Sequence, residues 1–224
     1  VHGVGDDLSK VGKTVRWRNI RIRILDLMDA RWEPDPDVVE INYIPNTLTP
    51  TEKRKGWRLL WDGETTRNWR GAQLDHFPKV GWTLEDGVLT VKESGGGESE
   101  HGGDIITANT FSEFELEVDF MLTEGANSGI KYFVDPELNK GEGSAIGLEY
   151  QLLDNERHPD ARMGVEGNRT LASLYDMIPA YNLSEDSPNL RFNGINRWNR
   201  ARIVVKADRV EHWLNNLKVV EYER

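Results

Sequence analysis

Alternation of apolar and polar residues is the dominant pattern of this chain. It is clearest at residues 113–122, EFELEVDFML, where the apolar residues face one way and the acidic residues face the other. Shorter alternating runs lie at 82–91, 128–134, 146–154 and 200–223. A period of two residues places successive side chains on opposite faces of a β-strand, whereas helical periodicity is scarce here. The pattern predicts an all-β chain.

Turn residues divide these runs into short strands. Asp86-Gly87 splits 82–91 into two strands, because glycine accepts the positive φ of a tight hairpin turn. Ala207-Asp208 and Asn215-Asn216 split 200–223 into three strands in the same way. Short strands separated by turn signals are typical of an antiparallel sandwich or barrel. We therefore expect a β domain that begins near residue 56.

One predicted strand, KTVRWRNIRIRIL at residues 13–25, stands near the front of the chain with no hairpin partner on either side. Its apolar residues change parity at Arg18-Asn19, which is the effect of a β-bulge on a two-sided strand. The apolar set is Val15 and Trp17 before the change and Ile20, Ile22 and Ile24 after it. The opposite face carries Arg16, Arg21 and Arg23.

Two segments lack a sustained strand pattern. Residues 26–55 contain four prolines and read as a Pro-rich linker with one short strand at 38–44. Residues 155–197 are polar and read as a long loop, with at most one or two helical turns at 170–178. Long loops on rigid β scaffolds commonly carry binding residues, so we expect the function near 155–197.

Composition restricts the classes of partner. The formal net charge is −10 and no dense Lys/Arg cluster offsets it, which argues against nucleic acid. Cysteine is absent, so disulfides and thiolate metal sites are excluded. No apolar run approaches the ~18 residues that a membrane-spanning helix needs. No phosphate-binding loop or Gly-x-Ser-x-Gly elbow is present.

Polar residues on two neighbouring strands form the first candidate site. Within 146–154, Glu149 and Gln151 project from the face opposite the apolar residues. Lys131 in the run 128–134, and Asn127 just before that run, also lie opposite the apolar residues of their strand. Adjacent strands would gather a carboxylate, two amides and an ammonium group. A solvent-facing outer sheet with cross-strand Glu–Lys pairs explains the same pattern, and the residues alone leave both interpretations open.

Other polar residues are less specific. The acidic row Glu113, Glu115, Glu117 and Asp119 is more typical of a soluble face than of catalysis. His212 is either a structural histidine or a titrating group in the site. His158 and Asp160 are metal ligands by type, but their spacing is unspecific and the metal stays unknown.

Seven ordered segments of the chain resemble a known family, the 3-keto-disaccharide hydrolase domain, over residues 56–224. They are GWRLLWDGETTRNWRG, WTLEDGVLTV, GGDIITANTFSEFELEVDFMLTEGANSGIKYFV, GLEYQLLDNERHPDA, LASLYDMIPA, WNRARIVVK and VEHWLNNLKVVEYE. The resemblance implies a concanavalin A-like jelly roll, that is, a two-sheet antiparallel β-sandwich, here with a long loop-rich insertion. It also implies that the face of Glu149 and Lys131 lines a sugar-binding groove.

The chemistry that the resemblance implies is cleavage of glycosides that carry a ketone at sugar carbon 3. A base removes the C2 proton, the enolate is stabilised, the C1 substituent leaves and water adds. Under this hypothesis Glu149 or His212 is the base or acid, and Lys131 stabilises the enolate, with a divalent cation as an optional helper. The proposed hydroxyl-binding residues are Asn127, Gln151, Asp104 and Tyr175.

Two other functions compete with this one. A non-catalytic carbohydrate-binding module would share the architecture, because fold does not determine function. A conventional glycoside hydrolase would need a pair of carboxylates in the groove and would act on unmodified sugars. In each case the partner is a carbohydrate, and the resemblance implies a bacterial, secreted protein that is periplasmic or extracellular.

The front strand also fits the resemblance. Residues 1–25 are similar to the strand that closes the family's jelly roll, whereas the chain stops after KVVEYE without the usual C-terminal strands. The segment is therefore either the tail of a preceding tandem copy or a permuted final strand of this sandwich. If no strand of this chain takes the place of the closing strand, the sheet has an open edge that a tandem domain or a second copy of the chain could contact. We favour pairing within the chain, because an orphan tail would not stay ordered.

Overall fold

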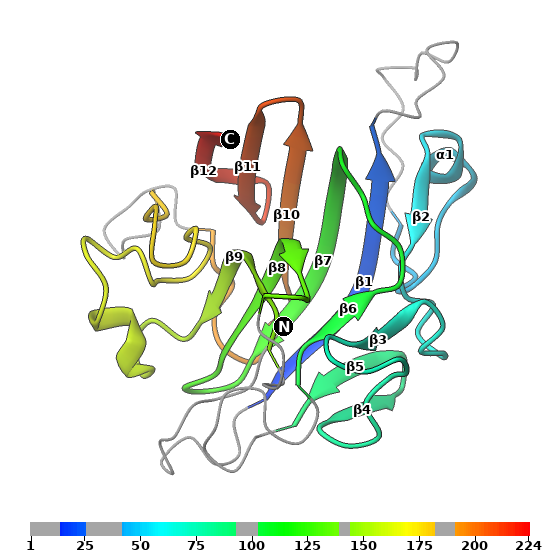
Figure 1. Cartoon of the computed structure of the whole chain (residues 1–224), viewed down its shortest axis with the longest axis horizontal. Helices are drawn as coiled ribbons and strands as arrows, with labels where there is room; N and C mark the ends of the chain where they lie inside the picture. Colours follow the sequence, from blue (N-terminus) through cyan, green and yellow to red (C-terminus); the bar gives the residue numbers. More distant parts are fainter. Residues whose placement is uncertain (1–13, 26–41, 93–102, 139–143, 182–190) are drawn as a thin grey trace.

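A computed structural model describes residues 14–25, 42–92, 103–138, 144–181 and 191–224. The strands form two facing layers around one apolar core (Figure 1). The larger layer is one 8-stranded sheet, and the second consists of two separate two-stranded sheets. The described residues contain one short α-helix, α1 (Pro50–Arg54), and one 3-10 helix, η2 (Pro159–Arg162). The predicted all-β antiparallel sandwich is confirmed.

The strand order places chain segments that are distant in sequence side by side. The large sheet runs β12 (Leu217–Glu223), β11 (Arg209–Leu214), β10 (Asn199–Lys206), β7 (Phe114–Leu122), β1 (Val15–Ile24), β5 (Val88–Val91) and β4 (Trp82–Glu85), with β2 (Trp57–Leu59) also on β1. The facing layer pairs β3 (Trp69–Gly71) with β6 (Ile105–Thr107) and β8 (Asn127–Asp135) with β9 (Ile146–Leu153). None of the described helices is long and apolar enough to cross a membrane.

The front strand lies inside this sheet. β1 pairs along one edge with β7, and along the other with β5 at Val15–Trp17 and with β2 at Arg21–Arg23. The register against β7 shifts between Arg18 and Arg21, and Asn19 has a φ of 51°. The predicted bulge is thus confirmed, and it lies where the neighbour of β1 changes from β5 to β2.

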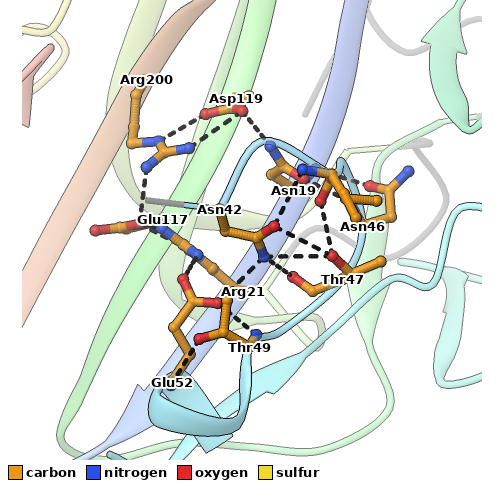
Figure 2. Close-up of polar contacts among 11 residues, drawn as sticks. Asn19, Arg21, Asn42, Asn46, Thr47, Thr49, Glu52, Glu117, Asp119 and Arg200 are labelled. Atoms are coloured by element: carbon orange, nitrogen blue, oxygen red, sulfur yellow. Dashed lines mark hydrogen bonds and ion pairs between the residues drawn. The ribbon is translucent and has the colours of Figure 1, made fainter. Parts of the chain in front are cut away.

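The two faces of β1 have opposite roles. Its inward residues Val15, Trp17, Ile20 and Ile22 are all at most 5% exposed. Its outward arginines meet the acidic row of β7, and the arginines of β10 meet the same row from the other side. Glu117 accepts from Arg21 Nε at 2.8 Å and Arg200 Nη1 at 3.4 Å, and Arg200 Nε donates to Asp119 at 2.7 Å (Figure 2). The acidic row is therefore held between two arginine rows.

The bulge is also held by the segment that precedes α1. The backbone N–H of Asn19 donates to Asn46 Oδ1, and the backbone N–H of Asn46 donates to Asn19 Oδ1 (Figure 2). Asn46 Nδ2 also donates to Gly87 O at 2.8 Å. Thr49 and Glu52 form a capping box on α1, and Glu52 also pairs with Arg21. The described part of the predicted linker thus packs on the sheet. Most of the strand predicted at 38–44 lies outside the described residues, and no strand forms at 42–44.

His212 lies in the core. It extends from β11 toward the second layer, where its Nε2 is 2.8 Å from Tyr132 OH and its Nδ1 is 3.1 Å from the carbonyl of Ala172. The side chain is fully buried, and its ring lies against those of Tyr132 and Tyr150. Burial lowers the pKa of His212 to about 4, so the imidazole is neutral in the folded protein at neutral pH.

We predict that Ile22→Ala lowers the free energy of unfolding by about 2–5 kcal/mol, because the truncation leaves a cavity where β1 meets the core. Urea denaturation of the whole chain measures the change. The control is Arg58→Ala on the cross-strand partner of Ile22, which is exposed and should change stability by only about 0.5 kcal/mol. Equal losses in the two variants would contradict a core position for β1.

We predict that His212 makes the fold acid-sensitive. The unfolded histidine binds a proton near pH 6.5 but the folded one only near pH 4, so stability falls as the pH drops through this window. The maximal slope is about 1.4 kcal/mol per pH unit, and His212→Gln should remove it from urea-denaturation curves recorded as a function of pH. His76→Gln, at an exposed histidine, is the control. An unchanged slope in His212→Gln would refute the assignment.

Candidate functional site

The outer face of the β8–β9 ribbon gathers the polar residues that the strand pattern placed together. Lys131 is the register partner of Glu149, and Gly129 is the partner of Gln151. Neighbouring residues of opposite parity, such as Tyr132 and Tyr150, belong to the core. Although the face points away from the large sheet, Glu149 is 8% exposed and Gln151 0%. The cluster is therefore buried, and the interpretation as a solvent-facing sheet does not hold.

Gly129 makes room for the Glu149 carboxylate. A Cβ atom built on Gly129 would lie 1.6 Å from Glu149 Oε1 and 2.4 Å from its carboxyl carbon. No side chain larger than hydrogen fits there without moving the carboxylate. The glycine is thus required by a close approach across the ribbon.

The two amides of the cluster bond to each other. Gln151 Nε2 donates to Asn127 Oδ1 at 3.0 Å, which links the diagonal neighbours on the two strands. Gln151 Oε1 is buried and has no hydrogen-bond partner among the described residues. A buried amide oxygen without a donor is costly.

Lys131 connects the ribbon to the other two-stranded sheet. Its Nζ donates to Asp104 Oδ2 at 2.9 Å, and the same oxygen accepts from the backbone N–H of Ala145 at 3.0 Å. Asp104 is 1% exposed and directly precedes β6, while Lys131 remains partly exposed. The ion pair therefore spans the gap between β8 and β6 and holds the ammonium group beside the Glu149 face.

The loop after β9 returns along the free edge of that strand. Gln151 N donates to Ser173 O at 3.1 Å, and Tyr175 N donates to Glu149 O at 3.0 Å. This pairing places Tyr175 beside Glu149. The predicted long loop is confirmed for its described part, and the segment 170–178 forms turns and isolated bridges rather than a helix.

Tyr175 is held by two charged residues of the same loop. Its hydroxyl donates to Asp160 Oδ2 at 3.0 Å, and Arg169 Nη1 donates to Asp160 Oδ1 at 3.0 Å. Burial raises the pKa of Tyr175, and the negative charges of Asp160 and Glu149 raise it further, against the opposing charge of Arg169. The phenol is therefore protonated at neutral pH. Arg169 was not among the predicted site residues, because only the loop conformation brings it to Tyr175.

The metal ligands suggested by residue type do not form a metal site. Asp160 uses both carboxylate oxygens for Tyr175 and Arg169, and His158 Nδ1 accepts from the backbone N–H of Asp160 at 3.2 Å as the cap of η2. No group of three or more His, Asp or Glu side chains in the described ranges is arranged to hold a metal ion. We therefore derive no step through a cation.

The structure brings together six of the seven predicted site residues. Lys131, Asn127, Gln151 and Glu149 share the outer face of the ribbon, Asp104 joins them through Lys131, and Tyr175 through the loop. His212 lies apart from them, because it contacts the core-facing residues of the same ribbon, Tyr132 and Tyr150. The ribbon itself separates His212 from Glu149.

Comparison with known proteins identifies the domain. A family model described as a 3-keto-alpha-glucoside-1,2-lyase-like domain matches residues 56–224. A 3-keto-disaccharide hydrolase of Bacteroides thetaiotaomicron is 41% identical over 177 residues, which are 75% of this chain and 58% of that protein. The chain thus spans less than two thirds of the length of this relative.

Solved structures show the same fold. A Parabacteroides distasonis protein described as a candidate glycosyl hydrolase matches with a TM-score of 0.63 and 26% identity, over 80% of this chain and 76% of that one. A second candidate glycosyl hydrolase from the same organism matches with a TM-score of 0.50 and 21% identity, over 69% and 72%, and shows the fold alone. The resemblance seen in the sequence is confirmed: the chain belongs to the 3-keto-alpha-glucoside-1,2-lyase-like domain family.

Proposed function

We propose that this domain cleaves 3-keto-glycosides by removal of the C2 proton, elimination and hydration. The observation that carries the proposal is the placement of Glu149 opposite Lys131 on a buried face that also holds two amides. The family assignment supports it, as does the name of the relative from Bacteroides thetaiotaomicron. A carbohydrate-binding module has no need for a buried carboxylate with a lysine as its register partner on the same face.

The proposed reaction begins at C2. The Glu149 carboxylate takes the C2 proton, and the electrons of that C–H bond form the enolate at the C3 oxygen. The Lys131 ammonium group stabilises the developing negative charge. The enolate then re-forms the ketone, the C1–C2 double bond forms, and the bond from C1 to the glycosidic oxygen breaks. The leaving oxygen keeps the electron pair of that bond and takes a proton from water. The hydroxide that results adds at C1, and the proton held by Glu149 returns to C2, which completes a net hydrolysis.

The other residues have supporting roles in this proposal. Asp104 is occupied by Lys131 and Ala145, so we assign it to positioning the ammonium group rather than to binding a hydroxyl. Gln151 is fully buried, so we assign it, together with Asn127, to supporting the face that carries Glu149 rather than to contacting a hydroxyl. Tyr175 closes the Glu149 side of the site, held by Asp160 and Arg169. His212 has no part in the reaction and acts in the core.

We predict that Glu149→Gln lowers the turnover of a 3-keto-disaccharide by about 10²–10⁴-fold, the usual loss for a general base. The measurement is release of free sugar, with the unoxidised disaccharide run in parallel. Glu85→Gln, at an exposed glutamate of the β4–β5 hairpin, is the matched control and should retain full activity. Undiminished activity in Glu149→Gln would sink the assignment, and binding of both sugars without cleavage would favour the carbohydrate-binding module.

We predict slower cleavage when deuterium replaces the hydrogen at C2 of the substrate, because the base breaks that bond in the proposed first step. The measurement is the ratio of kcat/KM for the two isotopic forms. Direct attack of water at C1, as in a conventional glycoside hydrolase, leaves the C2–H bond intact. Equal rates, together with cleavage of the unoxidised sugar, would therefore support that alternative.

We predict that Gly129→Ala impairs the reaction while all the charged groups remain in place. The added methyl group overlaps the position of the Glu149 carboxylate, so the base must move. A displacement on the order of 1 Å costs on the order of 10²-fold in rate. Thermal unfolding of Gly129→Ala separates a displaced carboxylate from a general loss of stability. Full activity in Gly129→Ala would contradict the seating of Glu149 described above.

A further inference from the structure

The loop that returns along β9 carries one extra residue where it meets Gln151. The backbone N–H of Ala172 donates to Gln151 O at 2.8 Å, whereas the backbone N–H of Gln151 donates to Ser173 O at 3.1 Å. Two successive loop residues thus oppose one residue of β9, and the first of them, Ala172, has a φ of 65°. This pattern is that of a G1 β-bulge, in which the first position is normally a glycine.

The bulge decides which loop side chains reach the candidate site. Side chains alternate between the two faces of a ribbon, so one extra residue exchanges the faces of all the residues that follow it. Beyond the bulge, Leu174 lies across from Tyr150 and is buried in the core. The next residue, Tyr175, bonds through its N–H to Glu149 O and lies beside Glu149 on the outer face. Without the extra residue, Leu174 would point outward and Tyr175 would point into the core.

Alanine is a poor residue for the first position of this bulge. In the left-handed region its Cβ atom comes too close to the following carbonyl oxygen, a contact that glycine avoids because it has no Cβ. The bulge also frees the carbonyl of Ala172 from β9, because Ser173 O accepts the Gln151 N–H in its place. Ala172 is fully buried, so its carbonyl needs another donor. The bulge is therefore stable only with support from outside the ribbon.

His212 supplies that support from the opposite layer. Its Nδ1 lies 3.1 Å from Ala172 O, and a carbonyl oxygen can only accept, so the proton of the neutral ring is on Nδ1. Nε2 is then an acceptor, and Tyr132 OH donates to it across 2.8 Å. Because Tyr132 spends its single proton on His212, it accepts its other bond from Tyr222 OH. The imidazole on β11 thus ends a chain of hydrogen bonds that is directed at the bulge.

We propose that His212 is a positioning residue for the candidate site. Its Nδ1–H holds the carbonyl of Ala172, and with it the bulge that keeps Tyr175 on the face of Glu149. Since the ribbon separates His212 from Glu149, the imidazole acts through the loop and contacts no substrate. The effect on catalysis rests on the proposed function, whereas the effect on the loop does not.

The first experiment measures the loop without any substrate. Hydrogen exchange of the whole chain, followed by mass spectrometry of fragments from 170–178, reports on the backbone N–H groups of Ala172 and Tyr175. We expect His212→Gln to accelerate this exchange about tenfold, because the buried carbonyl of Ala172 loses its donor. Tyr222→Phe removes the far end of the same hydrogen-bond chain and is the matched control, with exchange in the loop unchanged. Unchanged exchange in His212→Gln, or equal acceleration in both variants, would overturn the proposal.

A second substitution tests whether His212 acts through the bulge. Ala172→Gly added to His212→Gln should restore slow exchange in the loop, because glycine adopts a positive φ without the histidine. Ala201→Gly, at a buried alanine of β10 without a positive φ, should not restore it. Thermal unfolding shows which variants fold. If His212→Gln alone does not fold, recovery of the fold and of slow exchange by Ala172→Gly supports the proposal, and failure to recover them overturns it.

The second experiment tests the link to catalysis with a double-mutant cycle. We expect His212→Gln to lower kcat/KM for a 3-keto-disaccharide about tenfold at a temperature where the variant is folded. In the Tyr175→Ala background the same change should cost less than about twofold, because the side chain that His212 positions is already absent. Equal losses in the two backgrounds would overturn the positioning role. If the wild-type chain cleaves no 3-keto-disaccharide, the proposed function fails, whereas hydrogen exchange still decides whether His212 holds the bulge.

Discussion

The position of β1 in the middle of the large sheet is the constraint on which the rest of the structure depends. β1 joins β7 to the hairpin β4–β5 and to β2, so that without it the sheet would separate into three parts. Its inner face supplies Trp17 and Ile22 to the core, which accounts for most of its contribution to stability. Its outer arginines contribute less, because partly exposed ion pairs are typically worth about 0–1 kcal/mol.

The ion pairs of β1 have their main effect on register. A slip of one residue against β7 would turn Arg21 toward the core and Ile22 toward solvent. The bulge at Asn19 fixes the position along the strand, since Asn46 bonds to Asn19 and also to the carbonyl of Gly87 in the β4–β5 hairpin. Burial of the inner face therefore drives pairing, while the arginine rows and the asparagine pair select one alignment.

Features that depend on residues close together in the chain could be predicted from the sequence, whereas features that depend on distant segments could not. Alternation within a strand is local, so it predicted the strands and the shared face of Glu149, Gln151, Lys131 and Asn127. The same rule could have placed His212 in the core, because it shares parity with Val210 and Leu214. Helix α1 could have been found from Thr49, Pro50 and Glu52, an N-terminal capping box with proline at the first helical position.

Long-range pairing accounts for what the sequence did not reveal. The acidic row of β7 was interpreted as a soluble face, because its arginine partners are about 80–100 residues away in the chain. The return of the loop along β9, which brings Tyr175 to Glu149, depends on backbone bonds that no side-chain pattern records. Gly129 was visible as a glycine within a strand, but the carboxylate that requires it could be identified only in three dimensions.

The divided second layer covers the large sheet incompletely. The second layer is split between β6 and β8, and the two ribbons are joined by the ion pair of Lys131 with Asp104 and by the bond from Gln73 Nε2 to the carbonyl of Pro136. Because the two ribbons are not hydrogen-bonded as one sheet, the inner faces of β1 and β7 are incompletely covered between them. The loss of packing at this point is the physical cost of an opening next to Lys131, and a continuous second sheet would remove both the cost and the opening.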